Sequence, residues 1–154
     1  HNELDLENCV YPEYLISRVS DDGKLRIAGQ IDLLVKRGNK IIIGDWKTNK
    51  KIETKSFFNS KTKTSVKMKY PLNNLDDVNY WHYTLQLSTY AWMIQKKNPE
   101  FEIEDLVLVH FDHNDNMTVY HLPYLKDEVI KMLAFYKKES ILAENKKKRQ
   151  RIEY

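Results

Sequence analysis

The sequence predicts a single α/β (α+β) domain, with a mixed β-sheet that contains an antiparallel hairpin and is flanked by helices. Two observations support this class. The expected elements follow the order β-β-β-α-β-β-α, and short turns join the first three strands, which favours antiparallel pairing. The chain has 154 residues, 42% hydrophobic and 31% charged, and is long enough to bury a core. We therefore take residues 1–154 as one domain.

The first half of the chain is expected to form strands and a loop. The strands are expected over residues 11–19, 25–36 and 40–48. Gly38 and Asn39 form a two-residue turn between the second and third strands, which is typical of a tight hairpin. Residues 49–75 are polar, rich in lysine and without periodicity, so they are expected to form a long basic loop.

The second half begins with a helix over residues 78–97, which stops before Pro99. Apolar residues occur nearly all around this helix, so it should be well buried. The remaining elements are two strands and an amphipathic helix, expected over residues 105–112, 117–122 and 124–145. Residues 146–154 are expected to form a basic tail.

Basic residues gather in two parts of the chain, although its net charge of +3 is only mildly basic. The first part has Glu53 as its only acid and contains Lys47, Lys50, Lys51, Lys55, Lys61, Lys63, Lys67 and Lys69. The second contains Lys146, Lys147, Lys148, Arg149 and Arg151. Both parts are candidate regions for contact with phosphates.

The cysteines and histidines of the chain limit which metal-binding sites it can form. Cys9 is the one cysteine, which excludes a four-cysteine zinc or iron–sulfur site in this chain and favours a reducing compartment. We interpret His110 and His113 as surface turn residues, since their spacing fits no zinc pattern. No run approaches the ~18–20 apolar residues of a membrane span, so no membrane association is expected. The chain begins with His1 rather than Met, which predicts a fragment of a longer chain.

The hairpin over residues 25–48 carries charges among its apolar residues. With a two-residue loop, opposed residue numbers sum to 77, so Asp32 faces Asp45, and Lys47 points to the same side. The opposite face is apolar and is expected to pack on the core; it holds Ile27, Ile31, Leu33, Val35, Ile42 and Trp46. Gly29 and Gly44 also fall on that face, where another group is expected to approach closely.

Two opposed carboxylates repel each other, so something must offset that repulsion. One carboxylate can hold a proton, Lys47 can neutralise part of the charge, or a divalent cation can lie between the two aspartates. Ligands that are all oxygen favour Mg²⁺, Mn²⁺ or Ca²⁺. The alternative is a solvated strand face with a lysine–aspartate pair, and the spacing by itself leaves both open.

Three short motifs in this order resemble the PD-(D/E)XK nuclease superfamily, and most closely its RecB-like exonuclease branch. They are G-x-x-D ending at Asp32, D-W-K-T over residues 45–48, and Q-x-x-x-Y from Gln86 to Tyr90 on the following helix. The resemblance covers residues 11–97 directly. It implies a restriction-endonuclease-like core and a phosphodiesterase that uses Mg²⁺ or Mn²⁺.

The resemblance also implies roles for particular residues. Asp32, Asp45 and the backbone carbonyl of Trp46 would bind the metal, and Lys47 would position water and contact the phosphate. Gln86 and Tyr90 would order the active site and contact DNA. Glu13 matches an acid often seen in relatives, which either binds the metal or supports its ligands, and His1 is either the histidine ligand of this branch or the remnant of a tag. DNA would also meet the basic loop through Lys50, Lys51, Lys55, Lys61 and Lys63.

Two departures from the family pattern stand out. Members of this branch usually carry a histidine on a helix before the first strand, whereas His1 begins this chain, so the domain is expected to be truncated at its N-terminus. Several relatives bind an iron–sulfur cluster through four cysteines, which Cys9 cannot do alone.

The function expected from this resemblance is a metal-dependent DNA nuclease, more an exonuclease than an endonuclease, in replication, recombination or repair. A bacterial or phage-infected cytoplasm is the expected location, and a helicase or recombination protein is the expected kind of partner. The alternative function is a catalytically inactive nucleic-acid-binding module on the same fold. Cleavage polarity, strand preference, DNA against RNA, and oligomeric state stay open.

Overall fold

The computed structural model of this chain describes residues 8–48 and 51–152, and these form a five-stranded sheet with two long helices. The sheet contains β1 (Asn8–Val19), β2 (Arg26–Arg37), β3 (Lys40–Lys47), β6 (Glu102–Phe111) and β7 (Met117–His121), in the order β1-β2-β3-β6-β7. β3 and β6 are parallel, and the other neighbouring pairs are antiparallel. The predicted mixed sheet with an antiparallel hairpin and flanking helices is confirmed.

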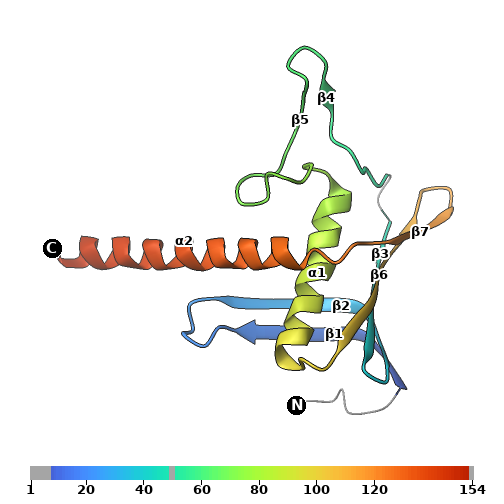
Figure 1. The fold of residues 1–154 in the computed structure, drawn as a ribbon, viewed down its shortest axis with the longest axis horizontal. Coiled ribbons are helices and arrows are strands. Elements are labelled where there is room, and N and C mark those ends of the chain that lie inside the picture. The colour runs from blue at the N-terminus through green and yellow to red at the C-terminus, as the bar shows by residue number, and fades with distance from the viewer. Residues whose placement is uncertain (1–7, 49–50, 153–154) are drawn as a thin grey trace.

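α1 (Asn79–Lys97) connects β3 to β6 and packs on one face of the sheet (Figure 1). It ends at Lys97, with Asn98 as its C-cap directly before Pro99, as the sequence predicts. Apolar side chains from α1 and the three central strands form the main core, which includes Ile31, Leu34, Ile43, Leu87, Ile94 and Leu108. Parallel pairing of β3 with β6 follows from this helical crossover, since a short turn cannot join parallel strands.

Two segments are more regular than the sequence predicts. Residues 49–75, expected as a loop, contain the antiparallel pair β4 (Phe58–Asn59) and β5 (Thr64–Ser65). α2 (Lys126–Ile152) runs beyond its expected end at residue 145, so the basic residues that follow continue the helix as far as Ile152. Lys, Arg, Gln and Glu are strong helix formers, and neither glycine nor proline interrupts this stretch.

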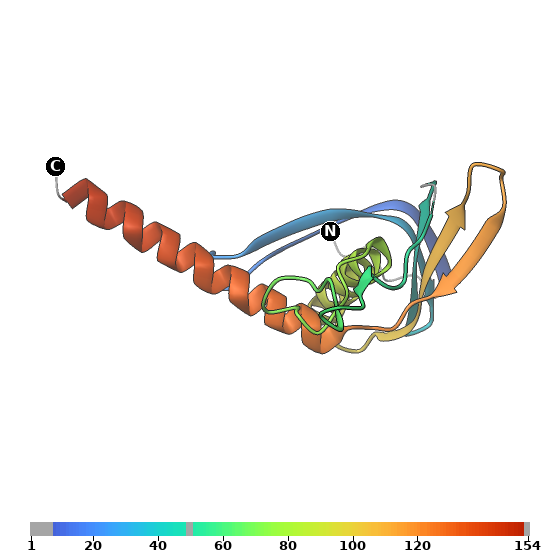
Figure 2. The same cartoon turned by 90° about the horizontal axis from the view of Figure 1, so that it is seen from above.

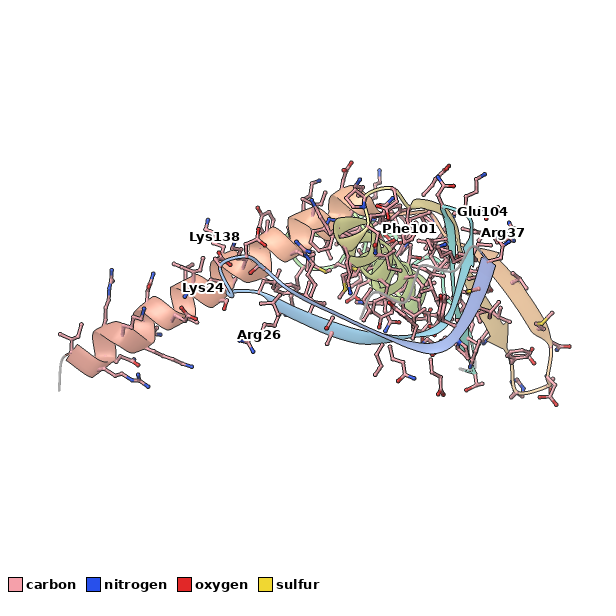
Figure 3. The ribbon with its side chains drawn as sticks, turned by 90° about the horizontal axis from the view of Figure 1, so that it is seen from below. Lys24, Arg26, Arg37, Phe101, Glu104 and Lys138 are labelled. Carbon is pink, nitrogen blue, oxygen red and sulfur yellow. The ribbon has the colours of Figure 1, made fainter. Side chains whose placement is uncertain are left out.

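The β1–β2 hairpin is long and curves over α1 until its turn meets α2 (Figure 2). Two ion pairs join the turn to that helix: Lys24 Nζ lies 2.6 Å from Glu144 Oε2, and Lys137 Nζ lies 2.7 Å from Asp22 Oδ2. Figure 3 shows Lys24 beside α2 and the Arg37–Glu104 pair at the opposite end of the hairpin. The hairpin therefore curves around α1 and does not continue the sheet as a flat edge.

The face that the hairpin turns toward α1 changes partway along both strands. In β2, Ile31 and Leu34 are both fully buried, although strict alternation would place residues three apart on opposite faces. In β1 the change falls at Glu13, whose positive φ of 51° is uncommon for a residue other than glycine. The strands therefore bend together where Glu13 and Asp32 lie across from each other between the pairs Pro12–Leu33 and Tyr14–Ile31.

This change of face overturns part of the expected core. Leu33, Val35, Ile42 and Trp46 were expected to pack inward, but the first three are half-buried and Trp46 is 47% exposed. The buried face of β3 instead carries Ile41, Ile43 and Asp45. The prediction was wrong because β3 is a central strand with apolar residues on both faces, so its sequence does not mark the face that a helix covers. The aspartates consequently lie on the face that α1 covers.

Candidate active site

Asp32 and Asp45 lie next to each other on neighbouring strands. The β2–β3 register pairs Leu33 with Gly44. Asp32 precedes Leu33 and Asp45 follows Gly44, so this register brings the two aspartates opposite each other, as the two-residue turn predicts. Asp32 Oδ2 accepts a hydrogen bond from the backbone N–H of Trp46 at 3.3 Å. Asp45 is only 8% exposed, and the Tyr83 ring of α1 lies against the neighbouring Lys47. Asp45 is thus buried and Asp32 half-buried, so this part of the strands is not a fully solvated face.

Burial and the neighbouring carboxyl control the acidity of Asp45. Desolvation raises the pKa of Asp45 to about 6, and its hydrogen bond with Asp32 adds to the rise, while the charge of Lys47 opposes both. Lys47 Nζ lies 3.2 Å from Asp45 Oδ2 and 4.8 Å from the centre of the Tyr83 ring on α1. Lys47 is therefore held between the carboxylate and an aromatic face.

The residues at this junction suit a divalent cation. Among residues 8–48 and 51–152, no donor hydrogen-bonds the buried Oδ2 of Asp45, although Lys47 pairs with it as an ion. A buried oxygen of this kind is normally satisfied, so it is open to a metal ion. The adjoining carboxyl of Asp32 supplies a second hard oxygen, which matches the preference of Mg²⁺ and Mn²⁺.

The other expected metal ligands are not shown to form a cluster with Asp32 and Asp45. No group of three His, Cys, Asp or Glu side chains in the described part of the chain is arranged to hold a metal ion. Glu13 is exposed at the bend of β1 and does not join the two aspartates in such a group. The Trp46 carbonyl belongs to the same end of β3, and His1 lies outside the described residues.

Tyr90 is buried on the face of α1 that meets β2, whereas Gln86, four residues earlier, is exposed. Gln86 Nε2 donates a hydrogen bond to the Tyr90 hydroxyl at 3.2 Å. The Tyr90 ring lies directly on Gly29, where an added Cβ would come within 2.5 Å of it. The sequence predicted a close approach at Gly29, and this is confirmed; at Gly44 the nearest atom would be 3.5 Å away, which is ordinary contact. Gly29 thus lets α1 approach the strand that carries Asp32.

His110 joins this region, although the sequence suggested a surface turn. It is 6% exposed, lies within β6 and pairs in register with Lys47 of the parallel neighbour β3. The surface interpretation is therefore wrong for His110. The sequence did not reveal that β6 pairs in parallel with β3. This pairing brings His110 beside Lys47, because the carboxyl ends of parallel strands meet at one edge of a sheet.

The expected DNA-binding lysines lie on the connection between β3 and α1. Lys55, Lys61 and Lys63 are exposed around the β4–β5 pair, and Lys51 is exposed with its Nζ 3.8 Å from Glu53 Oε1. Lys50 lies outside the described residues. No described helix is long and apolar enough to cross a membrane.

Comparison with solved structures finds two distant likenesses. One is the crystal structure of SSO0001, with 19% identity, a TM-score of 0.47 and coverage of 87% of this chain and 50% of that one. The other is a candidate exonuclease from Eubacterium rectale, with 14% identity, a TM-score of 0.49 and coverage of 88% and 45%. The chain thus spans about half the length of both structures. No curated protein matches the chain.

Comparison of the whole sequence with protein-family models identifies a family. The family model of the PD-(D/E)XK nuclease superfamily matches residues 2–153, which includes both aspartates, Lys47 and all of α1. The paired aspartates followed by lysine at the end of a central strand, on a mixed sheet covered by a helix, agree with this match. The chain therefore belongs to the PD-(D/E)XK nuclease superfamily.

Proposed function

We propose that this protein is a divalent-metal-dependent DNA nuclease of the RecB-like branch that acts as an exonuclease in replication, recombination or repair. The observation that carries the proposal is the junction of Asp32, Asp45 and Lys47, where the buried Asp45 Oδ2 is paired as an ion with Lys47 but makes no hydrogen bond with a described residue. Membership of a nuclease superfamily supports hydrolysis of nucleic acid as its chemistry.

Each residue has a role that follows from its position. Asp32, Asp45 and the Trp46 carbonyl would hold Mg²⁺ or Mn²⁺, which when bound supplies an activated water and stabilises charge on the phosphate. Lys47, held between Asp45 and the Tyr83 ring, would orient the attacking water and contact a phosphate oxygen. Gln86 and Tyr90 fix α1 against β2 and thereby fix the aspartates.

Binding would depend on phosphates more than on bases. The exposed lysines between β3 and α1 neutralise backbone charge, which makes affinity independent of sequence and strongly dependent on salt. The connection carrying them leaves β3 directly after Lys47, so DNA bound there passes close to the aspartates.

The deciding experiment is a cleavage assay on end-labelled linear DNA and closed circular DNA with Mn²⁺, Mg²⁺ or EDTA. The parent should degrade linear DNA only with metal, and Lys47→Ala should reduce the rate by about 10²–10⁴-fold, the usual range for a positioned catalytic group. Lys40→Ala is the matched control, because Lys40 is exposed at the opposite end of the same strand. It should leave the rate unchanged.

Other results would redirect the proposal. Cleavage of circles at a comparable rate would make the enzyme an endonuclease. An inactive parent that still binds DNA would support the alternative of a nucleic-acid-binding module without catalysis. Equal loss of activity in Lys40→Ala and Lys47→Ala would remove the special role of Lys47.

A further inference from the structure

An aromatic arm projects from the molecule next to the candidate active site. We define the arm as residues 54–75, which contain β4 and β5 and extend beyond the start of α1, away from the sheet (Figure 1). Two adjacent phenylalanines stand out on it, because Phe57 is 79% exposed and Phe58 is 59% exposed. Tyr70 is 72% exposed where the arm returns toward α1. Single exposed apolar residues are common, but neighbouring exposed rings indicate a contact surface.

The base of the arm is held firmly, so these rings have a defined place. Asp76 accepts a hydrogen bond from the Ser56 backbone N–H at 3.1 Å and pairs with Lys67. The backbone N–H of Asp77 donates to the Val66 carbonyl at 3.0 Å. These bonds join both ends of the arm just before α1, the helix that carries Tyr83 and Gln86. The arm is therefore anchored at the start of the helix whose Tyr83 contacts Lys47.

The charge of the arm identifies the kind of ligand. Residues 54–75 contain five lysines and no acidic residue. Lys67 is paired with Asp76, whereas Lys55, Lys61, Lys63 and Lys69 are exposed and form no ion pair with a described residue. A surface of this composition favours an anionic ligand that also offers flat apolar faces. Single-stranded nucleic acid has both features, since its phosphates attract lysine and its unpaired bases stack on aromatic rings.

A duplex fits the arm less well than a single strand. Stacked and paired bases hide their faces, so a duplex would engage the lysines and leave Phe57 and Phe58 in water. We propose that the arm binds single-stranded DNA, with unpaired bases stacked on Phe57 and Phe58 and phosphates on the surrounding lysines. This inference rests on the proposed nuclease function and adds a substrate class to it: DNA strands or ends whose bases are unpaired.

The test measures binding in EDTA, so that it is separate from cleavage. Fluorescence anisotropy would compare a labelled oligothymidylate of about 20 nucleotides, the same backbone with abasic sites, and a blunt duplex. The proteins are the parent, Phe57→Ala/Phe58→Ala, Phe57→Tyr/Phe58→Tyr and Leu15→Ala. Leu15 is 76% exposed on β1 and provides a matched loss of an apolar side chain away from the arm.

The parent should bind oligothymidylate at least about fivefold more tightly than the abasic strand, the lower end expected for one stacked base. The alanine double variant should lose this preference and keep its affinity for the duplex. The tyrosine double variant, which retains both rings, should bind like the parent, and so should Leu15→Ala.

Three results would overturn the inference. One is a parent with no preference for the strand that carries bases. Another is an alanine double variant that retains the preference. The third is a parent that self-associates in sedimentation experiments through Phe57 and Phe58, which would make the arm a protein interface. Because the cleavage assay uses Lys47→Ala and these tests use Phe57 and Phe58 without metal, either proposal can fail while the other stands.

Discussion

Asp45 combines burial with a neighbouring carboxyl, and both features oppose its negative charge. The pKa of Asp45 is raised to about 6 in the folded protein from 3.8, first by desolvation and then by Asp32. A raised pKa means that the folded state binds the proton more tightly than the unfolded chain does. The resulting stabilisation is complete below about pH 4 and is lost as the pH rises through about 6.

This linkage predicts a pH effect on stability without metal. In EDTA, the unfolding midpoint of the parent should fall between pH 4 and 6 relative to that of Asp45→Asn, whose amide does not titrate. Thermal unfolding measured across pH 4–8 tests this, with Asp21→Asn on the exposed β1–β2 turn as the control. Parallel curves for the parent and Asp45→Asn would contradict it. Above pH 6, Mn²⁺ should stabilise the parent and the control but not Asp45→Asn.

Gly29 matters because Tyr90 occupies the space that a side chain would need. An added Cβ would come within 2.5 Å of the Tyr90 ring, so Gly29→Ala must displace α1 or the ring. We expect a loss of about 1–3 kcal/mol in the free energy of unfolding, the usual range for overpacking. Urea unfolding checks this value.

Gly44→Ala is the matched control for Gly29→Ala, because its added Cβ would meet Leu33 at an ordinary 3.5 Å. This control should be neutral or slightly stabilising, since alanine loses less backbone entropy than glycine on folding. Equal destabilisation by the two alanines would show that the Tyr90 contact is not the cause.

At the scale of elements, Asp76 links the two ends of the arm. Its carboxylate bonds to Ser56 N–H and to Lys67, and these partners lower the pKa of Asp76. Asp76→Ala should therefore loosen residues 56–67 while the sheet stays intact. Amide hydrogen exchange should rise in the arm and stay unchanged in β3 and β6. Asp21→Asn again serves as the control, and unchanged exchange in the arm of Asp76→Ala would contradict this role.

At the scale of the whole molecule, α2 is packed at its start and exposed at its end. Val129 and Leu133 are buried, whereas all described residues from Asn145 onward are exposed. Glu144 pairs with Lys24 of the β1–β2 turn, and beyond this point the described part of the helix extends away from the sheet (Figure 2). Stability should accordingly depend on the first half of α2.

A truncation tests this division of α2. Ending the chain at Asn145 should leave the unfolding midpoint unchanged, because the removed described residues bury no apolar surface. Leu133→Ala should lower the free energy of unfolding by about 2–5 kcal/mol, as is usual for a buried leucine. A large loss of stability on truncation would show that the end of α2 contacts the body.

The sequence by itself determined the order of the elements, the antiparallel hairpin and the register that opposes Asp32 and Asp45. These depend on local signals: a two-residue turn fixes hairpin register, and a proline after a periodic segment marks the end of a helix. The close approach at Gly29 could also be predicted, since a glycine within a strand often marks one. Local signals therefore sufficed to place Asp32 and Asp45 opposite each other on neighbouring strands.

Only the tertiary structure decided which face of the sheet is buried and which residues join the aspartates. The bend at Glu13 and Asp32 changes the inward face of two strands at once, and α1 then covers Asp45. His110 enters the region through the parallel pairing of β6 with β3. Both outcomes depend on contacts between residues far apart in the chain, because packing and parallel register leave no pattern within a single strand.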